Sequence, residues 1–460
     1  MSTYSEIYTQ NAAMIARHSA GGLNRYREQL YERWSNTGFP TRKTENYRSI
    51  DLTEPLSVDY GLNLSRVQIP TDPARLFHCD VPDVSDNIHF VVNDQYYDRP
   101  DEPVGELPQG VVVCSMRRAC EQYGPLIDAY LSRLVMRFDD PIANFNGAFA
   151  QDGLFVYVPD GVRLDRPIQL INIMHAGGPL MANAHNLVVL GNDAYAQLLV
   201  CDHCMEQNIR FCATRTTEVF LGQRASYEHY KLENTSTQMC SLNNLLVSQA
   251  EGSRFLGNII TLHNGVTRNN ISIDQDGPGC DTHLCGMATL DGTQQVDNFS
   301  SIHHLHPQGT SNELFKYILD DSSRGVFMGR LKVMPGAQKT EAFQTNRNIL
   351  LTDTAQVRTK PQLEIYADDV KCSHGATTGQ LDEQALFYMR QRGIGEHEAK
   401  MLLMQAFVSD VTNNIRIPSL HERITLLVEN RLRGNRPTAG HACISNACGG
   451  CALADRKNKQ

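Results

Sequence analysis

Turn glycines recur at an almost constant interval through the middle of this sequence, and that interval constrains the fold more than any other feature. Between residues 150 and 375, short runs such as GLFVYVPDG and NLVVLGNDAYAQLLV have the alternating pattern of β-strands. The glycines between such runs are spaced 27 to 31 residues apart, and they are Gly161, Gly191, Gly222, Gly252, Gly279, Gly309 and Gly336. An immunoglobulin-like sandwich would need a turn roughly every 8–12 residues. The spacing therefore predicts a β-solenoid, whose stacked coils share one continuous core.

Helical patterns flank the repeat on both sides. Residues 9 to about 36 lack proline and are predicted to be helical, and Gly38 and Pro40 end that helix. Beyond residue 379, apolar residues follow the spacing of an amphipathic helix. The first such face consists of Ala399, Leu402, Leu403, Ala406 and Phe407, and the second of Leu420, Ile424, Leu427, Val428 and Leu432.

The predicted organisation has five parts. They are an N-terminal helical segment (1–50), a mixed α/β segment (51–149), a parallel β-helix core (150–379), a C-terminal helical domain (380–434) and a flexible tail that contains cysteines (435–460).

Composition narrows the functional classes. Of the 460 residues, 41% are hydrophobic and 20% are charged, so the chain is able to bury a large core. A net charge of −9 argues against non-specific nucleic-acid binding. The polar start MSTYSEIYTQN and the lack of a long apolar run predict a cytoplasmic protein without a membrane span. The 13 cysteines show no disulfide-like pattern, and we expect most of them to be free thiols.

The stretch ADDVKCSHGATTG, residues 367–379, lies where the predicted β-helix gives way to helices. It places Cys372 and His374 two residues apart. A structural zinc site takes four ligands, so this pair alone is incomplete. On a strand the two side chains would point the same way about 6.5 Å apart, too far for a nucleophile and its base. The arrangement suits two groups that face an interface with another chain, and the alternative is a partly buried cysteine beside a hydrogen-bonded histidine.

Three other clusters of cysteine and histidine are weaker candidates for metal sites. In CDHC (201–204), Cys201 and Cys204 would face opposite sides of a strand, so core thiols are favoured there and at Cys212. CDTHLC (280–285) is weaker still, and the histidines of IHHLHP (302–307) would point in different directions. No phosphate-binding loop of the GxxxxGK[ST] type, GxSxG motif or HExxH motif is found in the sequence.

The tail contains a further candidate site. Cys443, Cys448 and Cys451 have the C-x4-C-x2-C spacing of the cluster loop in plant-type ferredoxins. Residues 431–460 hold six Lys/Arg and one Asp, a net charge of +5 that favours thiolates. We expect a metal or an iron–sulfur cluster there, completed by His441 or by another chain. The alternatives are transient handling of cluster or sulfur, and a basic tail without a role.

Longer stretches of the sequence resemble a known family. The region of about residues 303–410, which includes TSNELFKYILDDSSRGVFMGRLKVMPG and KCSHGATTGQLDEQALFYMRQRGI, resembles the SufB/SufD family of iron–sulfur cluster assembly proteins, as does GFPTRKTENYR near the N-terminus. SufB proteins carry an essential cysteine in an LFYC motif, where this sequence has Met389. A thioether cannot form a persulfide. SufB also tends to have Glu-His-Glu in place of CSHG, so both differences favour the SufD side of the family.

The resemblance implies a fold and a function. The family has a right-handed parallel β-helix followed by a C-terminal helical domain. Its members pair as SufB with SufD and bind the ATPase SufC, and a nascent cluster is thought to form at the SufB–SufD interface. We therefore expect a non-enzymatic scaffold in which His374, with Cys372, faces the SufB thiolate and shares a transient iron–sulfur cluster. ATP hydrolysis would belong to SufC, and sulfur would arrive through SufB. Some complexes of the family are associated with a reduced flavin, for which no residues here indicate a site.

Two other functions stay open at this point. One is a SufB-like primary scaffold that uses a different cysteine, and the other is a β-solenoid binding protein whose Cys372 and His374 are structural. A homodimer of the isolated chain also stays open, because the sequence does not determine the oligomeric state. The sequence does not indicate the type of cluster.

Overall fold

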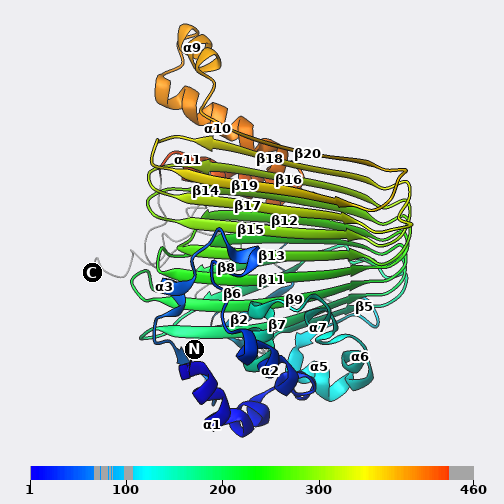
Figure 1. The fold of residues 1–460 in the computed structure, drawn as a ribbon. Helices are drawn as coiled ribbons and strands as arrows, with labels where there is room; N and C mark the ends of the chain where they lie inside the picture. The colour runs from blue at the N-terminus through cyan, green and yellow to red at the C-terminus, as the bar shows by residue number, and fades with distance from the viewer. Residues whose placement is uncertain are drawn as a thin grey trace.

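The computed structural model describes residues 2–66, 73, 81, 84, 86–97 and 107–434, and its centre is a parallel β-helix (Figure 1). Successive strands alternate between two facing sheets, which we name sheet A and sheet B. In spatial order, sheet A contains β19 (Gln356–Ile365), β17 (Arg324–Val333), β15 (Gln295–His304), β13 (Val266–Gln275), β11 (Met239–Gln249), β9 (Phe211–Leu221), β7 (Leu180–Leu190), β5 (Leu154–Val158) and β4 (Val112–Ser115), with β1 (Gly61–Leu62) paired to β7. In the same way, sheet B contains β20 (Lys371–Gly379), β18 (Glu341–Leu350), β16 (Thr310–Leu319), β14 (Asp281–Leu290), β12 (Arg254–His263), β10 (Ser226–Asn234), β8 (Tyr195–Cys204), β6 (Ile168–Met174), β2 (Ile88–Val92) and β3 (Gln95–Tyr97).

The β-solenoid predicted from the glycine spacing is confirmed. All seven glycines lie in connections that lead from a strand of sheet A to the next strand of sheet B. At Gly222, a Cβ atom would lie 2.6 Å from the carbonyl carbon of Gly191 in the coil below. Gly252 instead has a φ of +67°, which favours glycine. The interval arises because each coil returns to the same corner, where closely stacked or left-handed turns exclude side chains.

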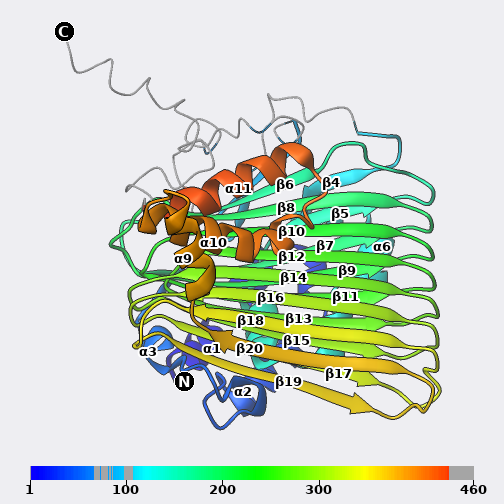
Figure 2. The same ribbon diagram turned by 90° about the horizontal axis from the view of Figure 1, so that it is seen from above.

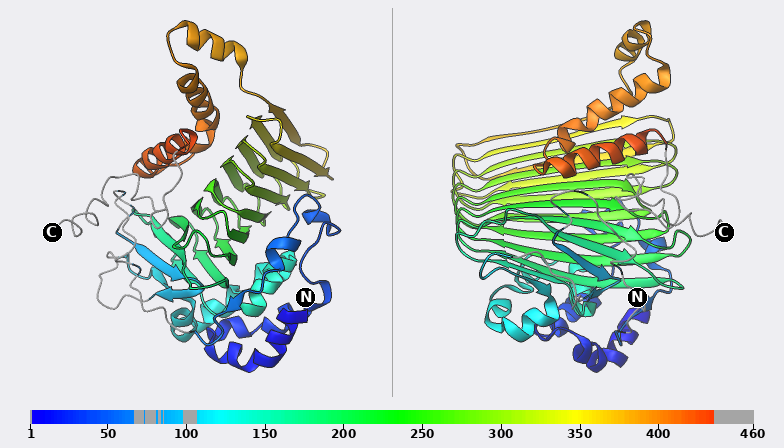
Figure 3. Two further views of the ribbon diagram at one scale, coloured as in Figure 1. Left: turned by 90° about the vertical axis from the view of Figure 1, so that its left-hand side faces the viewer. Right: turned by 180° about the vertical axis from the view of Figure 1, so that it is seen from behind.

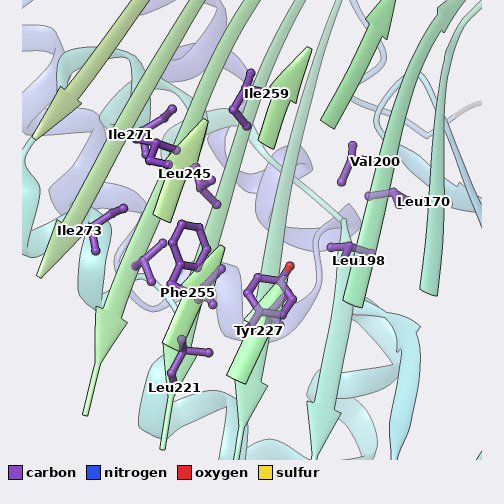
Figure 4. Close-up of a cluster of buried hydrophobic side chains, with 14 of the residues drawn as sticks. Leu170, Leu198, Val200, Leu221, Tyr227, Leu245, Phe255, Ile259, Ile271 and Ile273 are labelled. Atoms are coloured by element: carbon purple, nitrogen blue, oxygen red, sulfur yellow. The ribbon is translucent and has the colours of Figure 1, made fainter. Parts of the chain in front are cut away.

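The interior between the two sheets holds the main core. Leu198 and Tyr227 of sheet B face Leu245 and Ile271 of sheet A across this interior, as Figure 4 shows. The strands pair in parallel with their in-register neighbours, so equivalent inward positions stack along the helix axis at about 4.8 Å. Such stacking allows each coil to extend one continuous core.

The N-terminal helices cover the outer face of sheet A. Tyr4, Trp34 and Phe145 pack in one buried cluster with Met181 and Leu242 of that sheet. The helical elements of this half are α1 (Ser2–His18), η1 (Gly21–Asn24), α2 (Arg27–Thr37), η2 (Glu45–Tyr47), α3 (Thr53–Leu56), α5 (Met116–Gln122), α6 (Gly124–Tyr130), α7 (Arg133–Phe138) and α8 (Pro141–Phe149).

The prediction of one helix over residues 9–36 is wrong. Two α-helices form, α1 and α2, and residues 19–26 separate them, with the short 3₁₀-helix η1 at Gly21–Asn24. Gly22 approaches the α5–α6 region so closely that a Cβ would lie 2.7 Å from Ile127 Cγ2. The predicted end is confirmed, since α2 stops at Thr37 and Gly38 has a φ of 68°.

Three helices follow the β-helix, namely α9 (Glu383–Gln391), α10 (Glu396–Thr412) and α11 (Pro418–Leu432). Two of them, α10 and α11, lie on the opposite side, over the outer face of sheet B (Figures 2 and 3). The face predicted for α11 is confirmed at Leu420, Ile424 and Val428, which are buried.

The face predicted for α10 is confirmed at Ala399 and at Phe407, which packs against the cluster on sheet B, and it is wrong at Leu402, Leu403 and Ala406. The buried residues are Ala399, Met401, Met404, Val408, Val411 and Thr412, whereas Leu402 and Leu403 are partly buried and Ala406 is exposed. Apolar residues lie on most sides of this helix, so the spacing expected of a buried helical face is met both by Leu402 with Leu403 and by Met401 with Met404. The outer face of sheet B then decided which one is buried.

α9 differs from the other two helices in this region. It stands away from the strands beyond the last coil (Figure 1), and none of its residues is buried. Within the described ranges, no helix is long and apolar enough to cross a membrane.

Candidate functional site at the open end of the β-helix

The last strand of sheet B, β20, carries the ADDVKCSHGATTG motif to the open end of the β-helix. Among the described residues, β20 pairs with β18 on one side only. Its second edge therefore presents backbone N–H and C=O groups that another strand or chain could pair with. Most of its side chains are exposed, in contrast to the buried strands inside the stack.

Cys372 and His374 share the inward-facing side of β20. Cys372 lies in register with Ala342, and His374 lies in register with Gln344. Ala342 and Gln344 are buried, whereas Phe343 between them is exposed, so these positions face the interior of the last coil.

The two side chains differ in environment. Cys372 is half-buried and packs against the interior core. Burial raises the pKa of its thiol, although a backbone hydrogen bond from Ala342 opposes the rise. His374 is exposed, and its imidazole makes no hydrogen bond to any described residue, although its backbone pairs with β18. The imidazole is thus available to bind, while the thiol would have to lose a proton first.

The described residues contain no group of three or more cysteine, histidine or acidic side chains arranged to hold a metal ion. Cys372 and His374 therefore make at most two ligands of a larger site. Cys443, Cys448 and Cys451 of the tail lie outside the described residues, as does His441.

The weaker candidates from the sequence are separated in the structure. Cys201, Cys204 and Cys212 are buried in three different clusters. Burial raises the pKa of Cys204 and of Cys285 to about 12. These cysteines belong to the packing of the sheets, in agreement with the expectation of core thiols.

The histidines of IHHLHP also point apart. His303 lies 2.8 Å from Asp274, measured between Nδ1 and Oδ1. His304 lies 2.9 Å from Ser311, measured between Nε2 and Oγ, and burial lowers its pKa to about 4. The rings of His303 and His304 each have their own structural partner, and His306 is exposed in the turn that follows β15.

The α9 helix carries Met389, which stands where the sequence comparison expects an LFYC cysteine in SufB proteins. Met389 is partly buried, and Phe387 and Tyr388 beside it are 61% and 57% exposed. Asp382 caps the helix by accepting hydrogen bonds from the backbone N–H groups of Gln384 and Ala385. The helix is therefore formed by local interactions and offers aromatic surface outward.

Sequence reasoning missed the polar groups inside the β-helix. Arg215 and Lys231 lie 3.7 and 3.5 Å from the buried carboxylate of Asp202 and border a cavity of about 40 Å³. Nearer the open end, the carboxyl of Glu313 is fully buried beside Gln344. The alternation in SNELFKY, where Ser311, Glu313 and Phe315 share one parity, was the signal that could have identified Glu313 as inward-facing.

Comparison with known proteins identifies the family. Residues 172–407 match the family model described as SUF system FeS cluster assembly, SufBD core domain. Residues 1–170 match that of the SufBD protein N-terminal region.

Several relatives match over most of their length. The chain is 28% identical over 400 residues to an iron–sulfur cluster assembly SufBD family protein of Synechocystis sp., which covers 85% of this chain and 87% of the relative. It is 32% identical over 292 residues to the iron–sulfur cluster assembly protein SufD of Escherichia coli, covering 62% of this chain and 68% of the relative. SufD of Bacillus subtilis is 23% identical over 331 residues, covering 71% of this chain and 75% of the relative. With both family models matched in succession along the β-helix and its flanking helices, this chain belongs to the SufBD family of iron–sulfur cluster assembly proteins.

Proposed function

We propose that this chain is a SufD-type scaffold subunit without catalytic activity of its own. Its open end would pair with a SufB-type subunit, and a nascent iron–sulfur cluster would be assembled where the two chains meet. The observation that carries the proposal is the position of Cys372 and His374 together on the inward side of β20, at the edge of sheet B that no described strand pairs with.

The open end has the properties of a surface that a partner covers. Ile365 and Tyr366, at the end of β19, are 40% and 59% exposed, and Phe343 on β18 is 39% exposed. An unpaired strand edge next to exposed apolar side chains is unfavourable in water and suits strand addition by another chain. A β-helix of the same family would offer a matching edge.

The ligand chemistry also calls for a second chain. Neutral imidazole and thiolate are good ligands for iron. The thiol of Cys372, whose pKa is raised, would bind only after it loses its proton to a base or to the arriving metal. Two ligands leave an iron shell incomplete, so the partner would supply the rest.

Sulfur acceptance is assigned to the partner because of Met389. A thioether has no proton to lose and cannot carry a persulfide. The rival function, a primary scaffold that uses another cysteine, is disfavoured because the described cysteines other than Cys120 and Cys372 are buried.

A SufC-type ATPase would bind at α9. The buried faces of α10 and α11 pack on sheet B and are not available to this partner. α9 buries none of its residues and exposes Phe387 and Tyr388, so its aromatic surface is free for a partner.

Co-expression with SufB-type and SufC-type subunits tests the proposal. The complex should contain all three chains, and His374→Ala should leave its composition unchanged while bound iron and sulfide fall at least about tenfold. The matched control is His306→Ala, since His306 is also exposed but lies in a turn between β15 and β16. Equal iron in the two variants would contradict the role of His374. Purification of the chain alone, under gentle conditions and with both partners present, would favour a binding protein with structural Cys372 and His374.

The ATPase contact has its own test. Phe387→Asp should abolish retention of the SufC-type subunit, whereas Leu426→Asp should not, because Leu426 is an exposed residue of α11. Loss of the ATPase subunit with Leu426→Asp alone would move the contact to α11.

A further inference from the structure

A column of polar side chains leads inward from His374. In parallel strands, in-register neighbours lie about 4.8 Å apart. His374 of β20 neighbours Gln344 of β18, and Gln344 neighbours Glu313 of β16. All three positions face the interior, so the exposed imidazole stands directly in front of two buried polar groups.

Gln344 is held in one orientation. Its side chain is buried, and its Nε2 donates a hydrogen bond to Oε2 of Glu313. Gly329 lies opposite on sheet A, where an added Cβ would be only 1.9 Å from Gln344 Nε2. The glycine thus provides the space that the amide occupies.

The other end of the amide lacks a partner. Gln344 Oε1 is buried and accepts no hydrogen bond from any described residue. A buried acceptor without a partner costs about 1–3 kcal/mol. Because Nε2 is directed to Glu313, the unpaired oxygen is the part of the amide left for a donor from the neighbouring coil.

In its ionised form, Glu313 favours this orientation of the amide. It is fully buried, and burial raises its pKa to about 7, while its polar contacts with Ser300 and Gln344 oppose the rise. A carboxylate accepts hydrogen bonds only, so the ionised form requires the NH₂ group of Gln344 to face it.

We propose that Gln344 and Glu313 are positioning residues for His374, in which Gln344 Oε1 accepts a hydrogen bond from one ring N–H of His374 when the partner subunit covers the open end. This inference rests on the proposed role of His374 as a cluster ligand. The hydrogen bond leaves the lone pair of the other ring nitrogen directed outward, toward the metal. Metal-binding histidines usually donate their second N–H to an oxygen acceptor in this way, which fixes the tautomer and the ring.

The test uses the full complex with the SufB-type and SufC-type subunits. Gln344→Leu removes the acceptor at similar size, and we expect bound iron to fall about 10–100-fold with unchanged subunit composition. Gln344→Glu should restore most of the iron, because two carboxyls that share one proton still leave an oxygen for His374. Gly329→Ala, which displaces the amide from the opposite sheet, should reproduce the loss and serves if Gln344→Leu does not fold.

A double-mutant cycle separates positioning from a purely structural role. If Gln344 acts through His374, then Gln344→Leu should cause no further loss of iron in a His374→Ala background. Loss of iron with His374→Ala but normal iron with both Gln344→Leu and Gly329→Ala would overturn this inference and leave the proposed function intact. Additive losses in the double variant would also overturn it. Normal iron with His374→Ala would instead remove the proposed function itself.

Discussion

Replacement of Arg431 by methionine should release α11 from the β-helix. This arginine lies in the last turn of α11, and it is 8% exposed. Its Nε donates to the carbonyl of Leu262 at 2.7 Å, and its Nη1 pairs with Asp291 at 2.9 Å. Its Nη2 donates to the carbonyl of Thr289 at 3.4 Å and to Oε1 of Gln294 at 3.1 Å. One side chain therefore joins the helix to two coils of sheet B.

The expected destabilisation follows from what the substitution leaves behind. Methionine fills most of the volume, so little cavity is created, but the acceptors lose a charged donor worth about 1.5–3 kcal/mol for each hydrogen bond. Asp291 is partly exposed and regains water, whereas the carbonyl of Leu262 stays buried. Breaking a buried pair by removing one partner typically costs about 3–5 kcal/mol. We expect about 3 kcal/mol or somewhat more, concentrated in the docking of α11.

Hydrogen exchange followed by mass spectrometry measures this effect. Amides of residues 418–432 should exchange about two orders of magnitude faster in Arg431→Met, while β10 and β11 keep their protection. The control is Arg433→Met on the same helix, because Arg433 pairs with Glu429 and Glu398 at the surface and its loss should change exchange little. Equal effects of the two substitutions would refute the argument, as would uniform loss of protection through the β-helix.

Three further predictions follow from other parts of the fold. The pKa of Glu313 is raised to about 7, against 4.5 for a free side chain, so the folded state favours the protonated carboxyl. The stability that this carboxyl contributes is therefore present below pH 4.5 and is lost as the pH rises through 7, by at most about 3 kcal/mol. Urea denaturation from pH 5 to 8 should show this loss in the wild type and not in Glu313→Gln, and parallel curves for the two proteins would contradict it. Gly222→Ala should lower the free energy of unfolding by about 2 kcal/mol or more, because the added Cβ would lie 2.6 Å from the backbone of the neighbouring coil. Gly177→Ala should have little effect, because Gly177 has open space around it. Equal urea midpoints for the two variants would refute the stacking argument. Anaerobic reconstitution of the full chain should yield more iron and sulfide, or more zinc, than a chain ending at residue 437, because Cys443, Cys448 and Cys451 offer three thiolates; equal metal content would remove the tail site.

The motif with Cys372 and His374 shows how much of the candidate site can be predicted from sequence patterns. Alternation along a strand was enough to predict that Cys372 and His374 point the same way. It was also enough to separate Cys201 from Cys204, which the structure buries in different clusters. The roles of Glu313 and Gln344 could not be predicted this way, because a polar residue inside a strand breaks the rule that inward positions are apolar. The role of each of these two residues depends on which residue of the next coil lies beside it.

The sequence by itself determined the repeat, the strands and the helical ends, because turn glycines and alternating side chains act through local backbone geometry. It did not determine which face of α10 is buried, since Leu402 and Leu403 fit helical spacing as well as Met401 and Met404. Only contact with sheet B made that choice. The tertiary structure likewise decided that β20 is an edge and that His374 stands in front of Gln344 and Glu313. Register joins residues about thirty positions apart in the chain, as in the pairing of Gln344 with Glu313 across 31 residues, and no local pattern specifies such a pair.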